Sequence, residues 1–195
     1  IVVETEIPSV CLTERDIVVT VPMDIVEAAL PNILGVPSIP PGFLDADIMS
    51  IMTPEQLALL PTISVQETFT PEGLDAIPSA IDDVGAQGAL RLLDVVVGGS
   101  ADMFAGIERV AVTLVPGDPN LGGPVELAVC SVAAGCDVSM DQIQLTTDRE
   151  RDLLPLLNDP SATLQVDIVA KPTVTSWNLN VDVCMTGEAR LTVSP

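Results

Sequence analysis

The sequence predicts an all-β chain folded as a two-sheet antiparallel sandwich of about eight or nine strands, with a few short connecting helices. Three observations support this fold class. Short aliphatic runs of strand length recur at fairly even spacing, separated by glycine, proline and aspartate. No long helical segments alternate with these runs, which disfavours a doubly wound α/β fold. Hydrophobic residues make up 48% of the 195 residues, so the chain can bury a substantial core.

Proline is frequent in the first half of the chain, so the elements expected there are short. Residues 23–34 have helical spacing, which Pro31 interrupts. Thr53 can cap a helix, because Pro54 fits the first helical position and Gln56 can bond back to the cap. The elements expected in chain order are a strand over 15–21, a helix within 23–34, a loop over 37–47, a helix from Thr53 that stops by Pro61, a strand over 62–69 and a capped turn at 70–72.

The second half of the chain has the strongest strand signals. The segment 107–115 (IERVAVTLV) alternates at its start, and the turn-rich segment 116–124 (PGDPNLGGP) follows it. Residues 147–150 fit a capping box for a short helix that runs to Leu157. The strands expected in this half cover 90–97, 107–115, 125–132, 138–146, 164–170, 177–185 and 189–193.

We expect a single domain over residues 1–195, since no internal repeat or linker divides the chain. Residues 1–10 are a candidate assembly arm, because this segment precedes the first cysteine. The alternative is that they form an ordinary first strand of the chain's own sheet. Residues 23–86 are expected to form an irregular, proline-rich insertion.

The number and spacing of the cysteines predict the cellular compartment of the protein. The four cysteines form no CxxC pair, and the chain has no histidine to complete a zinc site. Cys130 and Cys136 flank a short loop, whereas Cys11 and Cys184 lie in the first and the last strand candidates. We therefore expect the disulfides Cys130–Cys136 and Cys11–Cys184, and a secreted, periplasmic or cell-surface location. The alternative is four buried free thiols in a cytosolic protein.

The charge balance limits the partners. The chain has 28 acidic and 7 basic residues, which give a net charge of −21. Nucleic-acid binding needs clustered lysine and arginine, and this sequence has no such cluster. No apolar run reaches the roughly 18 residues of a transmembrane helix, although proximity to a membrane stays open. The chain starts at Ile1 rather than at methionine, so either a signal peptide has been removed or the first residues are missing.

The absence of histidine excludes Ser-His-Asp and Cys-His catalysis, so we expect no enzyme and no cofactor. The carboxylate pairs Asp45/Asp47 and Asp82/Asp83 suit glycoside hydrolysis in principle, but carbohydrate sites usually carry aromatic platforms and this chain has few aromatic residues.

Acidic loop residues could instead bind calcium, which prefers oxygen ligands. The weak candidate ligands are Asp45, Asp47 and Asp118, and the alternative is that all three are solvated loop residues. No DxDxDG loop accompanies them.

Protein–protein contacts are the remaining class of site. Interface hot spots favour tryptophan and arginine, and an exposed strand can extend a neighbour's sheet. The candidate contact residues are Ile1, Val2, Val3, Arg109, Arg149, Arg151 and Trp177.

The segment from Gln87 to Val193 resembles secreted lipoproteins of bacterial envelopes that fold as immunoglobulin- or fibronectin-like sandwiches. The resemblance rests on LRLLDVVVGGSADMFAGIERVAVTL, on RDLLPLLND before ATLQVDIVA, and on the end cysteines in SVCLTE and VDVCMTG. It implies a disulfide-bonded sandwich in the cell envelope.

We therefore expect a non-enzymatic structural or accessory subunit of a bacterial cell-envelope or extracellular assembly, which acts through contacts with other protein subunits. Binding of an apolar ligand or a lipid is the first alternative, since the chain is rich in aliphatic residues. A calcium-dependent adhesin is the second.

Overall fold

The chain forms two antiparallel sheets with few helices, as the sequence predicts. The immunoglobulin or fibronectin type of the sandwich stays a prediction. The structure is a computed structural model, and it describes residues 2–39, 52–70, 87–99, 106–136, 142–144, 146–147, 152–157, 159–172 and 174–192.

The first sheet has the strand order β1-β9-β3-β6 and the second has the order β2-β8-β4-β5-β7. Strands of the first sheet are β1 (Val2–Thr20), β9 (Ser176–Thr192), β3 (Gln87–Gly98) and β6 (Gln142–Gln144). Strands of the second sheet are β2 (Ile63–Phe69), β8 (Thr163–Ala170), β4 (Ile107–Val115), β5 (Val125–Ser131) and β7 (Thr146–Thr147). The helices are α1 (Met23–Leu34), α3 (Pro54–Ala58) and α5 (Leu154–Leu157), with 3-10 turns η3 (Pro119–Leu121) and η4 (Val132–Ala134).

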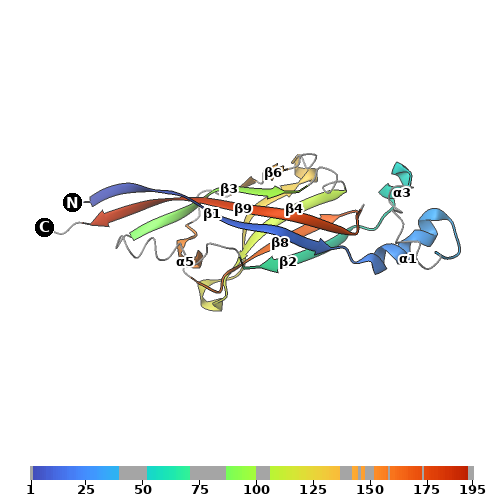
Figure 1. Ribbon diagram of the computed structural model, residues 1–195, viewed down its shortest axis with the longest axis horizontal. Helices are drawn as coiled ribbons and strands as arrows, with labels where there is room; N and C mark the ends of the chain where they lie inside the picture. The colour runs from blue at the N-terminus through green and yellow to red at the C-terminus, as the bar shows by residue number, and fades with distance from the viewer. Residues whose placement is uncertain are drawn as a thin grey trace.

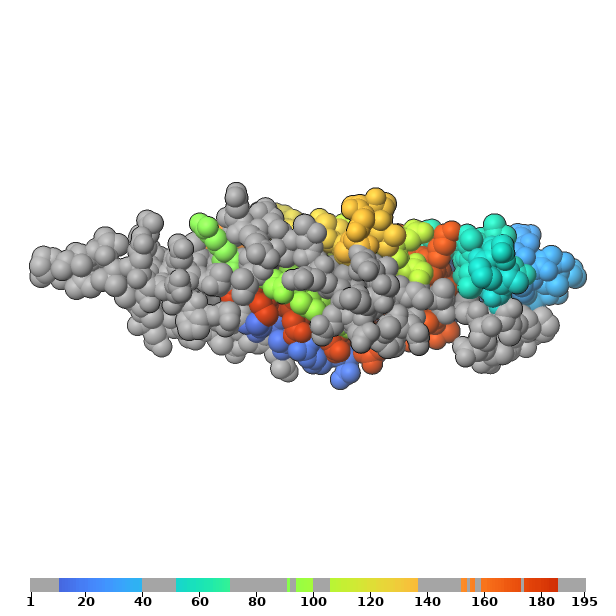
Figure 2. All heavy atoms as spheres, turned by 90° about the horizontal axis from the view of Figure 1, so that it is seen from above, coloured from blue at the N-terminus to red at the C-terminus, as the bar shows by residue number. Residues whose placement is uncertain are grey.

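The molecule is elongated (Figure 1). At one end, β1 and β9 extend past the region where the two sheets overlap, together with the start of β3, and both chain termini lie there. Helices α1 and α3 lie at the opposite end in both views (Figures 1 and 2). No helix in the described part of the chain has the length and apolarity that a membrane span requires.

The core lies between the sheets. In β8 every second side chain is buried, as expected for a strand with one face on the core. The same cluster includes Leu12 and Val19 from β1, Val95 from β3 and Trp177 from β9. Apolar side chains from both sheets therefore form one contiguous cluster, which holds the two sheets together.

The end strands are longer than the sequence suggests. β1 runs without a break from Val2 to Thr20, where a separate strand over 15–21 was expected, and β9 continues through Gly187. The two strands pair from Val2 opposite Thr192 to Thr20 opposite Ser176. Where the alternation of apolar and polar residues is interrupted, β1 and β9 stay paired, so the interruption produces a bulge and does not end the strand.

Within residues 23–86 the structure contains α1, α3 and the sheet strand β2, which correspond to the two helices and the strand expected there. Helix α1 continues through Pro31 to Leu34 and ends at Gly35, whose φ of 68° is left-handed. Val26 and Leu30 on α1 are fully buried, so packing outweighs the proline's lost hydrogen bond.

The capping box of α3 is confirmed. The Gln56 backbone N–H donates to Thr53 Oγ1 at 3.3 Å, and the Thr53 N–H donates to Gln56 Oε1 at 2.9 Å. The capped turn at 70–72 and the capping box at 147–150 lie largely outside the described residues, and α5 begins at Leu154.

Candidate functional site

Strand β1 forms an edge of the first sheet. Within the described residues its one sheet neighbour is β9, which lies between β1 and β3. An edge strand of 19 residues leaves a long row of backbone N–H and C=O groups without a strand partner. Figure 2 shows that β1 and β9 reach the molecular surface side by side. The open side of β1 is therefore the candidate site for contacts with another chain.

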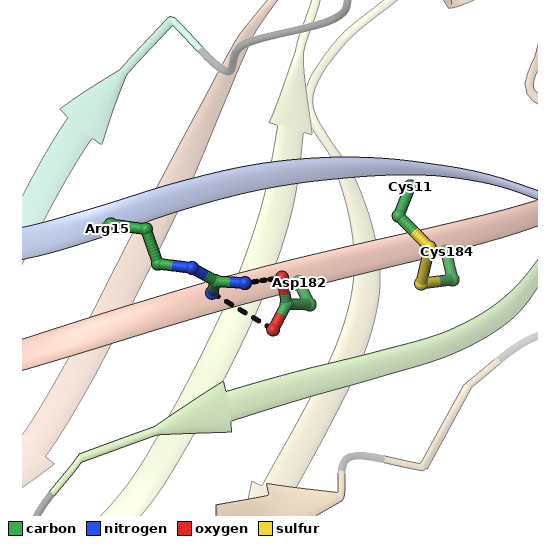
Figure 3. Close-up of a disulfide and its surroundings, with 4 residues drawn as sticks. All are labelled: Cys11, Arg15, Asp182 and Cys184. Carbon is green, nitrogen blue, oxygen red and sulfur yellow. Dashed lines mark hydrogen bonds and ion pairs between the residues drawn. A yellow bond between two sulfur atoms is a disulfide. The ribbon is translucent and has the colours of Figure 1, made fainter.

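The disulfide Cys11–Cys184 joins this edge strand to β9 (Figure 3). The two cysteines are directly opposite in the strand register, and their Cα atoms are 4.0 Å apart. Such a short separation is typical of a non-hydrogen-bonded antiparallel pair. The backbone groups of Cys11 therefore point away from β9, toward the open side, and the alternation extends this to Thr13, which is opposite Asp182.

A bulge beyond Glu14 changes which side chains face the core. Leu12 is buried before the bulge, and Ile17 and Val19 are buried after it, so the inward face shifts by one residue. Asp16 takes a φ of 56°, a left-handed conformation that aspartate tolerates better than most residues.

Two side chains of β9 hold this bulge in place. Arg15 binds the Asp182 carboxylate with both terminal nitrogens, at 2.6 and 3.0 Å (Figure 3). The Asp16 backbone N–H donates to Asn180 Oδ1 at 3.1 Å. The hydrogen bond to Asp182 raises the pKa of Arg15; desolvation opposes this shift, and the charge of Asp182 adds to it. The bulge is thus fixed from the outer face of the sheet.

The second disulfide joins Cys130 at the end of β5 to Cys136, which follows η4. Cys130 is fully buried, and Cys136 is partly buried against the core. Both expected pairings are thus present in the structure. The two bridges are consistent with an extracellular or other oxidising compartment.

The candidate contact residues lie in very different environments. Trp177 is 0% exposed, so its assignment as a contact residue is wrong, because β9 points this side chain into the core. Arg109 is half-buried and pairs with Glu126. Val2 and Val3 lie in β1, where they are opposite Thr192 and Leu191. Ile1, Arg149 and Arg151 lie outside the described residues.

This pairing also bears on the proposed arm at 1–10. From Val2 onward the segment pairs with the chain's own β9, which matches the alternative of an ordinary first strand. What remains available to a neighbour is the other side of the strand.

Asp118 caps a turn instead of standing free as a ligand. Its carboxylate accepts hydrogen bonds from the backbone and side-chain nitrogens of Asn120, both at 2.8 Å. Asp45, Asp47 and the pair Asp82/Asp83 lie outside the described residues. Among the residues that the structure describes, no three acidic or cysteine side chains gather closely enough to hold a metal ion.

A buried carboxylate next to Asp118 ties two loops together. Asp159 Oδ2 accepts the backbone N–H groups of Gly117 and Asp118 at 2.7 and 2.8 Å. Asp159 Oδ1 accepts the N–H and the hydroxyl of Ser161 at 2.9 and 2.5 Å. The Ser161 hydroxyl, followed by the backbone donors, lowers the pKa of Asp159 to about 2.

Sequence reasoning missed the roles of Asp16 and Asp159. For Asp159 a signal was present, because Asp-Pro-Ser is a typical turn sequence in which the aspartate bonds to the backbone two residues on. For Asp16 no local signal exists, since the bulge depends on pairing with a strand more than 160 residues away.

Comparison with models of known protein families and with curated proteins finds no match for this chain.

Proposed function

We propose that this protein is a non-enzymatic structural or accessory subunit of a bacterial cell-envelope or extracellular assembly, and that it contacts a neighbouring chain by strand addition at β1. The open side of this 19-residue edge strand is the single observation that supports the proposal most strongly. Strand addition takes affinity from main-chain hydrogen bonds, which any extended partner segment can supply.

The irregularities of β1 define where a partner strand fits. Register shifts lie between Ile7 and Val10 and between Glu14 and Ile17. Bulges twist an edge away from a neighbour, so regular pairing is expected in the stretches 2–7 and 10–14. The second stretch is the better defined, because the disulfide holds it to β9.

The charge of the chain favours a basic partner over a second copy. Residues 16–90 contain no lysine or arginine but many acidic residues. Three of the basic side chains that the structure describes are engaged internally: Arg15 binds Asp182, Arg109 binds Glu126, and Lys171 Nζ donates to the Ala58 carbonyl oxygen. A neighbour with a positive surface therefore meets uncompensated negative charge.

A proline substitution tests this proposal, because it can remove a single backbone N–H on the open side of β1. Thr13→Pro deletes an N–H on the open side and leaves the pairing with β9 in place, since edge strands tolerate proline there. Thr13→Val keeps the N–H and is the matched control. Deleting residues 1–7 is less specific, because that change also unpairs the end of β9.

Each variant is cross-linked in the native particle, and the attached chains are identified by mass spectrometry. We expect Thr13→Pro to lose a neighbour that wild type and Thr13→Val both retain, with all three unfolding at similar temperatures. If the folded Thr13→Pro variant keeps every neighbour, strand addition at the 10–14 stretch of β1 is ruled out.

A further inference from the structure

We propose that the Cys11–Cys184 disulfide is a thiol-exchange site, which an external dithiol opens selectively while Cys130–Cys136 stays intact. This inference does not depend on the proposed function, because it rests on the different surroundings of the two bridges.

The two bridges differ in how a thiolate can reach them. Cys11 is exposed and lies on an edge strand that has no second sheet neighbour among the described residues. Cys184 is half-buried between β1 and β3, so Cys11 is the more exposed residue of the bridge and the side from which a thiolate is expected to approach. Cys130 is 0% exposed, and attack at its sulfur is blocked by the core.

The leaving sulfur also differs between the bridges. Attack at Cys136 would expel the Cys130 sulfur as a thiolate within the apolar core, where burial disfavours the charged form. Attack at Cys11 expels the sulfur of Cys184, a partly exposed residue that lies two positions from Asp182 on the same outer face of β9. A better-solvated leaving group speeds exchange.

The exchange balances in two steps. The first thiolate of the dithiol bonds to Cys11 Sγ, and Cys184 Sγ leaves as a thiolate that takes up a proton. The second thiolate of the dithiol then attacks the dithiol's sulfur in the mixed disulfide and releases Cys11 as a thiol. The dithiol is oxidised to its disulfide by two electrons, and the protein gains two thiols.

The probe is dithiothreitol at limiting concentration, applied to the full-length native protein. Samples are quenched with iodoacetamide at intervals, and each cysteine is followed by peptide mass spectrometry. We expect alkylation of Cys11 and Cys184 to be at least about tenfold faster than that of the other pair. The same experiment in strong denaturant should open Cys130–Cys136 much faster than in the native protein, because unfolding removes the burial of Cys130.

Two variants isolate the bridges. The double variant Cys130→Ser/Cys136→Ser keeps only the edge bridge, which should open as fast as in the wild type. The double variant Cys11→Ser/Cys184→Ser keeps only the core bridge, which should stay slow while the protein is folded. Equal native rates, or faster opening of the core bridge in the native protein, would each overturn the proposal.

Discussion

The Cys11–Cys184 disulfide at the sheet edge should contribute more to stability than the Cys130–Cys136 disulfide, although it lies on the surface. Cys11 and Cys184 are 173 residues apart, whereas Cys130 and Cys136 are six apart. A bridge restricts the unfolded chain in proportion to the logarithm of the loop that it closes. On that basis the long loop contributes about 5 kcal/mol and the short loop about 2 kcal/mol.

The assay compares two double variants by thermal unfolding without reductant. For a chain of this size, 1 kcal/mol corresponds to about 2–4 °C in Tm. Cys11→Ser/Cys184→Ser should therefore lower Tm by about 10–20 °C, and Cys130→Ser/Cys136→Ser by about 4–8 °C. Neither variant carries an unpaired thiol, so reshuffling does not confuse the comparison. A larger loss of Tm in Cys130→Ser/Cys136→Ser than in Cys11→Ser/Cys184→Ser would refute the reasoning, because it would mean that local packing outweighs loop length.

Three further changes test other parts of the structure. Gly117→Ala places a methyl group 2.7 Å from Ser161 Cβ and should cost about 1–3 kcal/mol in urea unfolding, whereas Gly123→Ala meets nothing within 4 Å and should be nearly neutral. The pKa of Asp159 is lowered from 3.8 to about 2, so its contribution to stability is complete above pH 3.8 and is lost as the pH falls through 2. Asp159→Asn should therefore flatten the dependence of the urea midpoint on pH between these values. An unchanged slope in this variant would contradict the assigned role of Asp159. Arg15→Met removes an exposed ion pair but leaves the Asp16–Asn180 hydrogen bond of the bulge, so it should cost no more than about 1 kcal/mol, with a smaller effect at high salt. A larger loss that salt does not reduce would contradict this assignment.

Several features were predictable because their causes are local in sequence. The capping box at Thr53 needs only a hydroxyl, a proline and a glutamine within four residues. The strand expected over 164–170 corresponds to β8, in which every second side chain is buried, since side-chain direction in a strand has a period of two. The spacing of the four cysteines was enough to indicate both disulfides.

Other features depend on partners that are distant in sequence. Tryptophan is a residue type that interface hot spots favour, but Trp177 lies opposite Val19 in the strand register and its side chain is buried in the core. The bulge at Asp16 depends on the pairing of β1 with β9. The stretches 2–7 and 10–14 are open to a partner only because no described strand lies on the other side of β1. The sequence by itself therefore determined the β class, the local caps and the cysteine pairs. The tertiary structure alone decided which edge stays open and which cysteine is exposed, because exposure depends on the whole packed arrangement and no short segment encodes it.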